Sequence, residues 1–93
     1  MRGKDRAELR AAAHHLKPTV HVGHLGVTDT VLQSLDDALR ANELVKIQVE
    51  RNAPMSVKET ANVLAAQVGA DVVQVIGRKT SLYRYNPEKH QSR

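Results

Sequence analysis

The chain has 93 residues, of which 41% are hydrophobic and 26% charged, and it contains no cysteine. This length and balance predict one folded domain with a modest core and little room for a deep substrate cleft. The lack of cysteine excludes disulfides, thiolate metal sites and a cysteine nucleophile, and it fits a reducing compartment. The first ten residues are charged and no apolar run reaches membrane-spanning length, so we expect a cytoplasmic protein without a signal peptide.

The formal net charge is +4, and it is unevenly distributed. Residues 1–27 carry five Lys or Arg against two acids, residues 28–43 carry one against four, and residues 44–93 carry eight against four. The basic charge therefore lies outside the second predicted helix. An asymmetric basic surface favours nucleic acid or an anionic membrane as a partner, and simple solubility is the plain alternative.

The first half of the chain predicts a helix, a short strand and a second helix. Apolar residues with i, i+3, i+4 and i+7 spacing favour a helix over residues 5–16. The helix is expected to end at the Lys17-Pro18 step, because the residue before a proline avoids the helical conformation. A β-branched run at residues 19–22 predicts a strand. Thr28 is placed to cap the next helix. The buried stripe of that helix consists of Val31, Leu32, Leu35, Ala38 and Leu39.

The second half predicts a strand, a helix and a hairpin. Residues 43–50 alternate in polarity, which predicts a strand with one apolar face. Ser56 and Glu59 have the spacing of a capping box at the start of the third helix, and Gly69 ends it. Two further strands, residues 71–77 and 81–86, are expected to form a hairpin.

The element order α-β-α-β-α-β-β predicts a single compact α/β sandwich, a four-stranded mixed sheet with three helices. Helical connections between the first three strands favour parallel pairing among some of them. We expect the domain to span residues 1–86 and residues 87–93 to form a flexible polar tail.

Gly23 and Gly26 stand between the first strand and the second helix. Glycine lets a ligand approach the backbone closely, and the first N–H groups of a helix have no internal partner. Together these features can hold a phosphate without a charged side chain. Two glycines are also common in ordinary strand–helix turns, so the loop alone leaves both interpretations open.

Other sites fit the sequence less well. The chain has only the second half of a dinucleotide-binding glycine motif, and the loop lacks the lysine of a P-loop. The histidines at 14, 15, 21 and 24 lack partners at metal-ligand spacing. The spacing of serine, histidine and acidic residues gives no catalytic triad, so we expect no enzyme activity. From the glycine and histidine patterns above we also expect no cofactor and no metal. With Tyr83 and Tyr85 as the only aromatic residues, a base-stacking sheet is disfavoured.

Three segments taken together resemble the CRM domain, named for chloroplast RNA splicing and ribosome maturation. They are "LKPTVHVGHLGVTDTVLQSLDDAL", "ELVKIQV" and "VGADVVQVIGRKTSLYR", which follow one another in family order. The likeness covers residues 9–84 and is strongest to the small stand-alone bacterial members of the YhbY type. It implies an RNA-binding α/β fold similar to the C-terminal domain of translation initiation factor three, and an association with precursors of the large ribosomal subunit.

The resemblance also implies which residues bind RNA. The loop residues carried over are Gly23, His24, Leu25 and Gly26. Many members have a basic residue followed by a polar one inside this loop, where this chain has His24 and Leu25. Because of this resemblance, we expect five basic residues to form one surface that faces RNA. Its members are Lys17, Lys46, Arg78, Lys79 and Arg84.

Each of these residues also has a plain structural interpretation. Lys17 can complement a helix C-terminus, Lys46 can be solvated surface, and Arg84 can pair with an acid across the sheet. Arg78 and Lys79 can be ordinary turn residues, and Leu25 is expected to pack against the domain. The function predicted is binding of ribosomal RNA during large-subunit assembly. The alternatives are a protein-interaction adaptor with a basic face for an acidic partner, and DNA binding.

Overall fold

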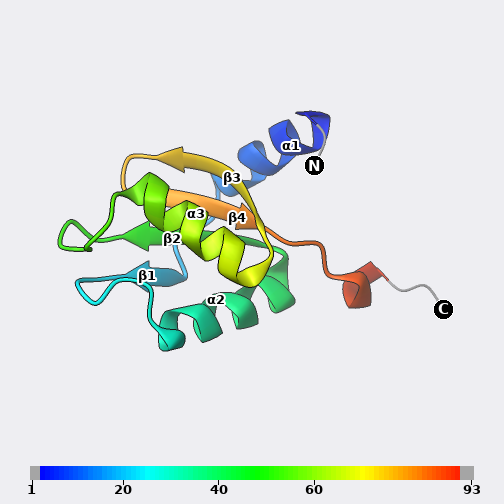
Figure 1. The fold of residues 1–93 in the computed structure, drawn as a ribbon. Helices are drawn as coiled ribbons and strands as arrows, with labels where there is room; N and C mark the ends of the chain where they lie inside the picture. Colours follow the sequence, from blue (N-terminus) through cyan, green and yellow to red (C-terminus); the bar gives the residue numbers. More distant parts are fainter. Residues whose placement is uncertain (1–2, 91–93) are drawn as a thin grey trace.

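Three helices and a four-stranded mixed sheet follow one another in the predicted order (Figure 1). The computed structural model describes residues 3–90, and side chains from residue 6 onward. The elements are α1 (Gly3–Ala13), β1 (Val20–Val22), α2 (Asp29–Asn42), β2 (Leu44–Val49), α3 (Val57–Val68), β3 (Asp71–Ile76), β4 (Lys79–Tyr83) and the 3-10 helix η1 (Pro87–His90).

The strands lie in the order β1-β2-β4-β3. β1 runs parallel to β2, with Val20 opposite Ile47, and this confirms the expected parallel pairing. β4 runs antiparallel to both β2 and β3. The predicted hairpin is therefore present, and its second strand lies in the middle of the sheet beside β2.

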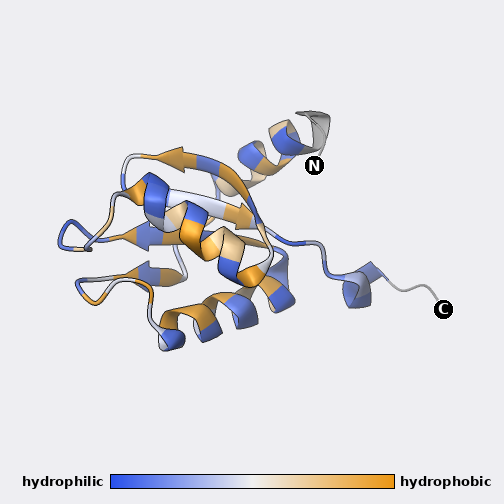
Figure 2. Cartoon of the chain, in the orientation of Figure 1, coloured by the Kyte–Doolittle hydropathy of each residue, from blue (hydrophilic) through white to orange (hydrophobic). Residues whose placement is uncertain are grey.

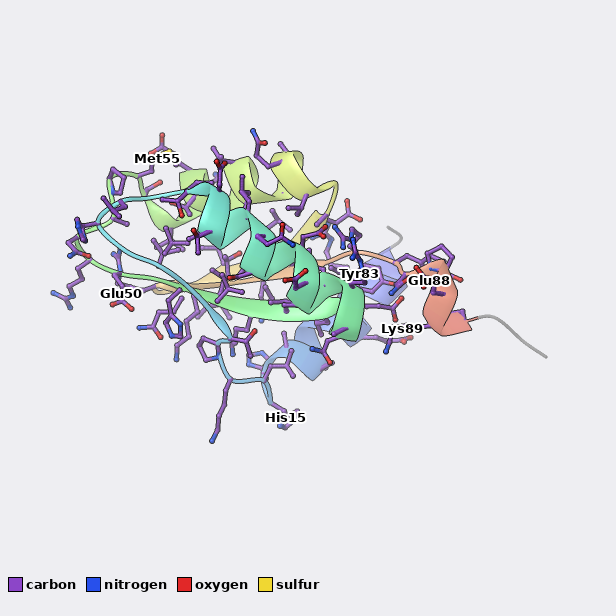
Figure 3. The ribbon with its side chains drawn as sticks, turned by 90° about the horizontal axis from the view of Figure 1, so that it is seen from below. His15, Glu50, Met55, Tyr83, Glu88 and Lys89 are labelled. Carbon is purple, nitrogen blue, oxygen red and sulfur yellow. The ribbon has the colours of Figure 1, made fainter. Side chains whose placement is uncertain are left out.

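Helices cover the two faces of the sheet unequally. α2 and α3 pack side by side on one face, whereas α1 contacts β2, β3 and β4 from the other (Figure 3). The single helix leaves part of its face uncovered. A groove lined by residues of β2, β3 and β4 opens there.

The hydrophobic core lies between the sheet and the α2–α3 pair (Figure 2). The predicted alternation of β2 is confirmed, because Val45, Ile47 and Val49 are buried while their neighbours are only half-buried. The core residues are Val20, Val22, Leu35, Leu39, Val45, Ile47, Val49, Val57, Leu64, Ala65 and Leu82. This burial fixes which face of each strand turns toward α1.

The predicted helix caps are confirmed. The Thr28 hydroxyl accepts a hydrogen bond from Val31 N at 3.1 Å. Ser56 and Glu59 form a reciprocal capping box at the start of α3. Gly69 ends α3 with a left-handed backbone, the conformation that glycine adopts without steric cost.

The predicted boundaries of two elements, the first helix and the last strand, are wrong. α1 ends at Ala13, before Leu16, and the Leu16 side chain is 36% exposed. Beyond Ala13 the helical hydrogen bonds give way to a tighter turn, in which His15 N donates to Ala12 O at 3.2 Å and Leu16 N donates to Ala13 O at 3.1 Å. Lys46 Nζ also donates to Ala13 O at 3.1 Å. The last strand covers Lys79–Tyr83, earlier than residues 81–86, because pairing with β2 begins at Lys79.

The segment after β4 returns to the C-terminal end of α2. Glu43 caps α2 with a positive φ of 62°, and its carbonyl accepts a hydrogen bond from Arg84 N. The Glu43 carboxylate accepts a hydrogen bond from Asn86 N at 2.7 Å, and this contact lowers the pKa of Glu43. η1 follows, and residues 91–93 of the expected tail lie outside the described residues.

Arg84 joins the end of β4 to both helices of the core. Its Nη1 donates to Asp36 Oδ1 at 2.7 Å and to Val68 O at 3.1 Å. Its Nη2 donates to Asp36 O at 3.2 Å. The hydrogen bond from Arg84 lowers the pKa of the Asp36 carboxyl against the opposing effect of desolvation. The predicted alternative of a pairing with an acid is thus realised, although the acid belongs to α2.

We predict that Arg84→Ala lowers the free energy of unfolding by about 1–3 kcal/mol, because it removes charge-assisted hydrogen bonds from a half-buried site. The part of this stabilisation that comes from the ion pair with Asp36 is fully present above a pH of about 4. It is lost as the pH falls through the lowered pKa of the Asp36 carboxyl. Urea denaturation at pH 7 and pH 3 measures both effects.

Arg40→Ala is the matched control, since Arg40 pairs with the same carboxylate but is 64% exposed. We expect it to change stability by less than about 0.5 kcal/mol. Equal stability of Arg84→Ala and the parent at pH 7 would contradict a structural role for Arg84.

Candidate nucleic-acid interface

The loop between β1 and α2 is a tight turn with an exposed tip. Gly26 N donates to Gly23 O at 2.9 Å, which places His24 and Leu25 at the tip. The Leu25 side chain is 73% exposed, so the expectation that it packs against the domain is wrong. Gly26 of the same turn lies beside Pro54.

Gly26 is required by the fold itself. Its φ is +71°, a conformation that residues with a Cβ rarely adopt. A Cβ added there would also lie 2.8 Å from Pro54 Cγ and 3.3 Å from Pro54 Cδ. The glycine therefore lets the turn pack against the loop that follows β2.

Gly23 is not required in this way. Its φ lies outside the left-handed region, and a Cβ added there would meet no atom within 4 Å. Any small residue could therefore occupy this position without a clash inside the described domain. A glycine with open space before it keeps the backbone accessible to a ligand.

A hollow of about 230 Å³ lies beside the turn, lined by residues 23–26 together with Thr28 and Val31. The first N–H groups of a helix have no intrahelical acceptors, and at the start of α2 the Thr28 hydroxyl accepts one of them, from Val31 N. Asp29 adds a negative charge in the first turn of α2. An anion held here must therefore depend on backbone N–H groups and on cations from neighbouring loops.

Two other loops lie at the same edge of the sheet. Because β1 and β2 are parallel, their carboxyl ends meet there, and the turn between β3 and β4 joins them (Figure 1). Glu50 N donates to Val22 O at 2.8 Å, and Val49 N donates to Arg78 O at 2.8 Å. We call residues 23–26, 50–55 and 77–79 the loop edge. Figure 3 shows Glu50 and Met55 at this edge, away from Tyr83 and Lys89.

Arg78 holds the loop edge together. Its Nε donates to Val49 O at 2.8 Å and its Nη2 donates to Glu50 O at 2.7 Å. Both acceptors are backbone carbonyls at the end of β2, so the guanidinium keeps its positive charge without a carboxylate partner in these contacts. Arg78 thus fixes the hairpin turn and adds positive charge at the same place.

The structure brings together some of the predicted basic residues but not all. Lys79 is exposed at the loop edge beside Arg78, and half-buried Lys46 lies farther along β2. Lys17 precedes β1 and Arg84 follows β4, so both lie toward the opposite end of the sheet. The expected surface therefore divides between two ends of the domain.

Sequence reasoning missed Arg51, which is exposed at the loop edge next to Glu50. Arg51, Asn52 and Arg78 line one hollow there together with Gln48 and the acidic Glu50. The position of Arg51 just after the second strand could have identified it, because residues that follow two neighbouring parallel strands meet at one edge of a sheet.

The described residues contain no group of three or more His, Cys, Asp or Glu side chains that could hold a metal ion. Among the described helices, none combines the length and apolar character needed to cross a membrane.

Comparison with known proteins places the chain in a family. Residues 1–84 match the CRS1 / YhbY (CRM) domain. The chain is 36% identical to the Bacillus subtilis protein named Probable RNA-binding protein YqeI, over 96% of this chain and 93% of that protein. It is 34% identical to a Haemophilus influenzae protein named RNA-binding protein, over 91% of this chain and 86% of the relative. The chain belongs to the CRS1 / YhbY (CRM) domain family.

A solved structure supports the same assignment. The solution structure of the hypothetical protein SAV1595 from Staphylococcus aureus, described as a candidate RNA-binding protein, has a TM-score of 0.80 and 32% sequence identity. The match covers 92% of this chain and 90% of that one. The predicted family and fold class are therefore confirmed.

We predict opposite effects for alanine at the two loop glycines. Gly26→Ala should lower the free energy of unfolding by about 1–3 kcal/mol, because it forces a Cβ into a left-handed backbone and against Pro54. Gly23→Ala should leave stability unchanged or raise it by up to about 1 kcal/mol, since alanine restricts the unfolded chain. Thermal and urea denaturation of the two variants decide this. A Gly23→Ala variant as unstable as Gly26→Ala would show that the fold needs both glycines.

Proposed function

We propose that this chain is an RNA-binding protein and that the loop edge holds the RNA backbone. Gly23, His24, Leu25 and Gly26 supply the turn. Arg51 and Lys79 supply exposed cations on the two neighbouring loops, and Arg78 adds a fixed positive charge between them. Lys46 extends the positive charge along the sheet.

The observation that carries this proposal is the glycine at position 23. The fold explains Gly26 but gives no steric or conformational reason for Gly23. Close approach of a ligand to the backbone is a physical reason for such a glycine, and a phosphate is the ligand that bare N–H groups and nearby cations suit. A turn of this type that clamps a nucleic-acid backbone is a known mode of RNA recognition.

The relatives support the same class of ligand. The proteins from Bacillus subtilis and Haemophilus influenzae are named as RNA-binding, and a Pseudomonas aeruginosa relative, 32% identical, is named Probable RNA-binding protein PA4753. We propose further that the RNA is ribosomal and that the protein assists assembly of the large subunit in the cytoplasm. This finer proposal rests on the family resemblance.

One observation favours a second candidate. Leu25 at the turn and Ile76 beside the hairpin are exposed apolar side chains at the same edge, and such residues also suit a protein partner. An adaptor with an acidic partner would use the same cations. Its association would not depend on RNA, so a direct test of RNA affinity separates the two functions. Comparing the affinity for the RNA with the affinity for a DNA duplex of matching sequence separates RNA binding from DNA binding.

We predict that affinity for structured ribosomal RNA falls linearly with salt on a log–log scale, with a slope of about −3 to −5 for four to six phosphate contacts. Lys79→Ala and Arg51→Ala should each weaken binding and flatten this slope by about 0.7 to 0.9. Fluorescence anisotropy at several salt concentrations measures both quantities.

Arg40→Ala is the control, because it removes an exposed arginine from the last turn of α2, at the other end of the domain. It should keep the parent's slope. Fragments of large-subunit RNA should bind more tightly than fragments of small-subunit RNA if the finer proposal is correct. A slope near zero for the parent would contradict RNA binding through phosphate contacts and would favour the protein-interaction adaptor.

A further inference from the structure

The sheet face that α1 leaves partly uncovered carries a groove of about 360 Å³. Its walls come from β2, β3, β4 and the end of α1. The side chains that matter for binding are His14, Lys46, Gln74, Ile76, Lys79 and Ser81. None of the described residues that line this groove is acidic, so its charge suits an anionic ligand.

The strand register arranges the groove in two rows. Lys46, Ser81 and Gln74 lie opposite one another on β2, β4 and β3. Lys79 and Ile76 form the next row on the same face. The two rows are separated by two residues, or about 7 Å, along the strands. One nucleotide can span this distance between its base and its phosphate.

Ser81 is a polar residue buried in the floor of this groove. It is 1% exposed, and its Oγ has no hydrogen-bond partner among the described residues. Burying a hydroxyl group without a partner costs stability. Neighbouring Thr80 shows the usual arrangement, because its buried Oγ1 donates to Gln74 O at 2.9 Å. Ser81 Oγ therefore has bonding capacity that the fold does not use.

The surrounding groups define the chemistry of a ligand. Lys46 Nζ donates one hydrogen bond to Ala13 O at 3.1 Å, which leaves two of its three N–H groups. Ile76, 55% exposed, offers an apolar wall beside Lys79. Gln74 and Ser81 can both donate and accept hydrogen bonds, as the polar edge of a nucleobase requires. This combination suits a base and its phosphate without requiring aromatic stacking.

We propose that this groove holds one unpaired nucleotide of the bound RNA, with its base edge at Ser81 and Gln74 and its phosphate at Lys79. Because Ser81 Oγ lies below the accessible surface, the flexible Lys46 or Gln74 side chain beside it moves when the base enters. The inference rests on the proposed RNA-binding function. The groove adjoins the loop edge through Lys79, so a single strand of RNA can contact both.

The test compares an RNA hairpin that has unpaired loop nucleotides with a blunt duplex of the same stem sequence. Fluorescence anisotropy gives the affinity of the parent, Ser81→Ala and Gln74→Leu for each RNA. Both variants should bind the hairpin about three- to tenfold more weakly, as expected for one lost hydrogen bond to a ligand, and bind the duplex like the parent. Ser81→Ala should melt at the parent's temperature or above, because it removes an unpaired buried hydroxyl.

Thr80→Val is the matched control, since it removes a buried hydroxyl that already has a structural partner in the same strand. It should melt at a lower temperature and keep the parent's affinity for both RNAs. Ser81→Ala and Gln74→Leu variants that bind the hairpin like the parent, or that weaken hairpin and duplex equally, would overturn the nucleotide site. Displacement of the hairpin by millimolar uridine 5′-monophosphate as effectively as by single-stranded RNA would assign the groove to free nucleotides and also overturn it. A parent that binds neither RNA would remove the proposed function itself.

Discussion

The parallel pairing of β1 with β2 is the constraint on which the candidate site depends. It brings the carboxyl ends of both strands to one edge, so that the glycine turn lies next to residues 50–55. Pro54 then packs against Gly26, and Glu50 N donates to Val22 O at 2.8 Å. β4 pairs antiparallel with β2, which brings the hairpin turn to the same edge. Three loops that are distant in sequence thus form one surface.

The basic residues of this domain have two distinct roles. Arg6, Arg78 and Arg84 donate to backbone carbonyls and fasten α1, the loop edge and the end of β4 to their neighbours. Lys46 does the same for the C-terminal end of α1. Arg51 and Lys79, by contrast, are exposed at the loop edge. Net charge alone therefore overstates the positive surface available to a ligand, because several cations also stabilise the fold.

Periodicity and capping residues were sufficient to predict the element order, the inward face of β2 and the ends of α3. They did not predict the end of α1, because apolar spacing continues to Leu16 while the backbone already turns after Ala13. The glycine turn was identified from its place between strand and helix. The different status of Gly23 and Gly26 could not be predicted, because it depends on the position of Pro54. Buried Ser81 was likewise missed, since its row on the sheet follows from strand register.

The most direct test of the central claim is the RNA affinity of Gly23→Asp measured together with its melting temperature. The substitution places a negative charge and a side chain where we propose that a phosphate binds, at a position with open space inside the fold. We expect at least a roughly tenfold loss of affinity, which corresponds to about 1.4 kcal/mol, with a parent-like melting temperature. A folded Gly23→Asp variant that binds RNA as tightly as the parent would contradict the account.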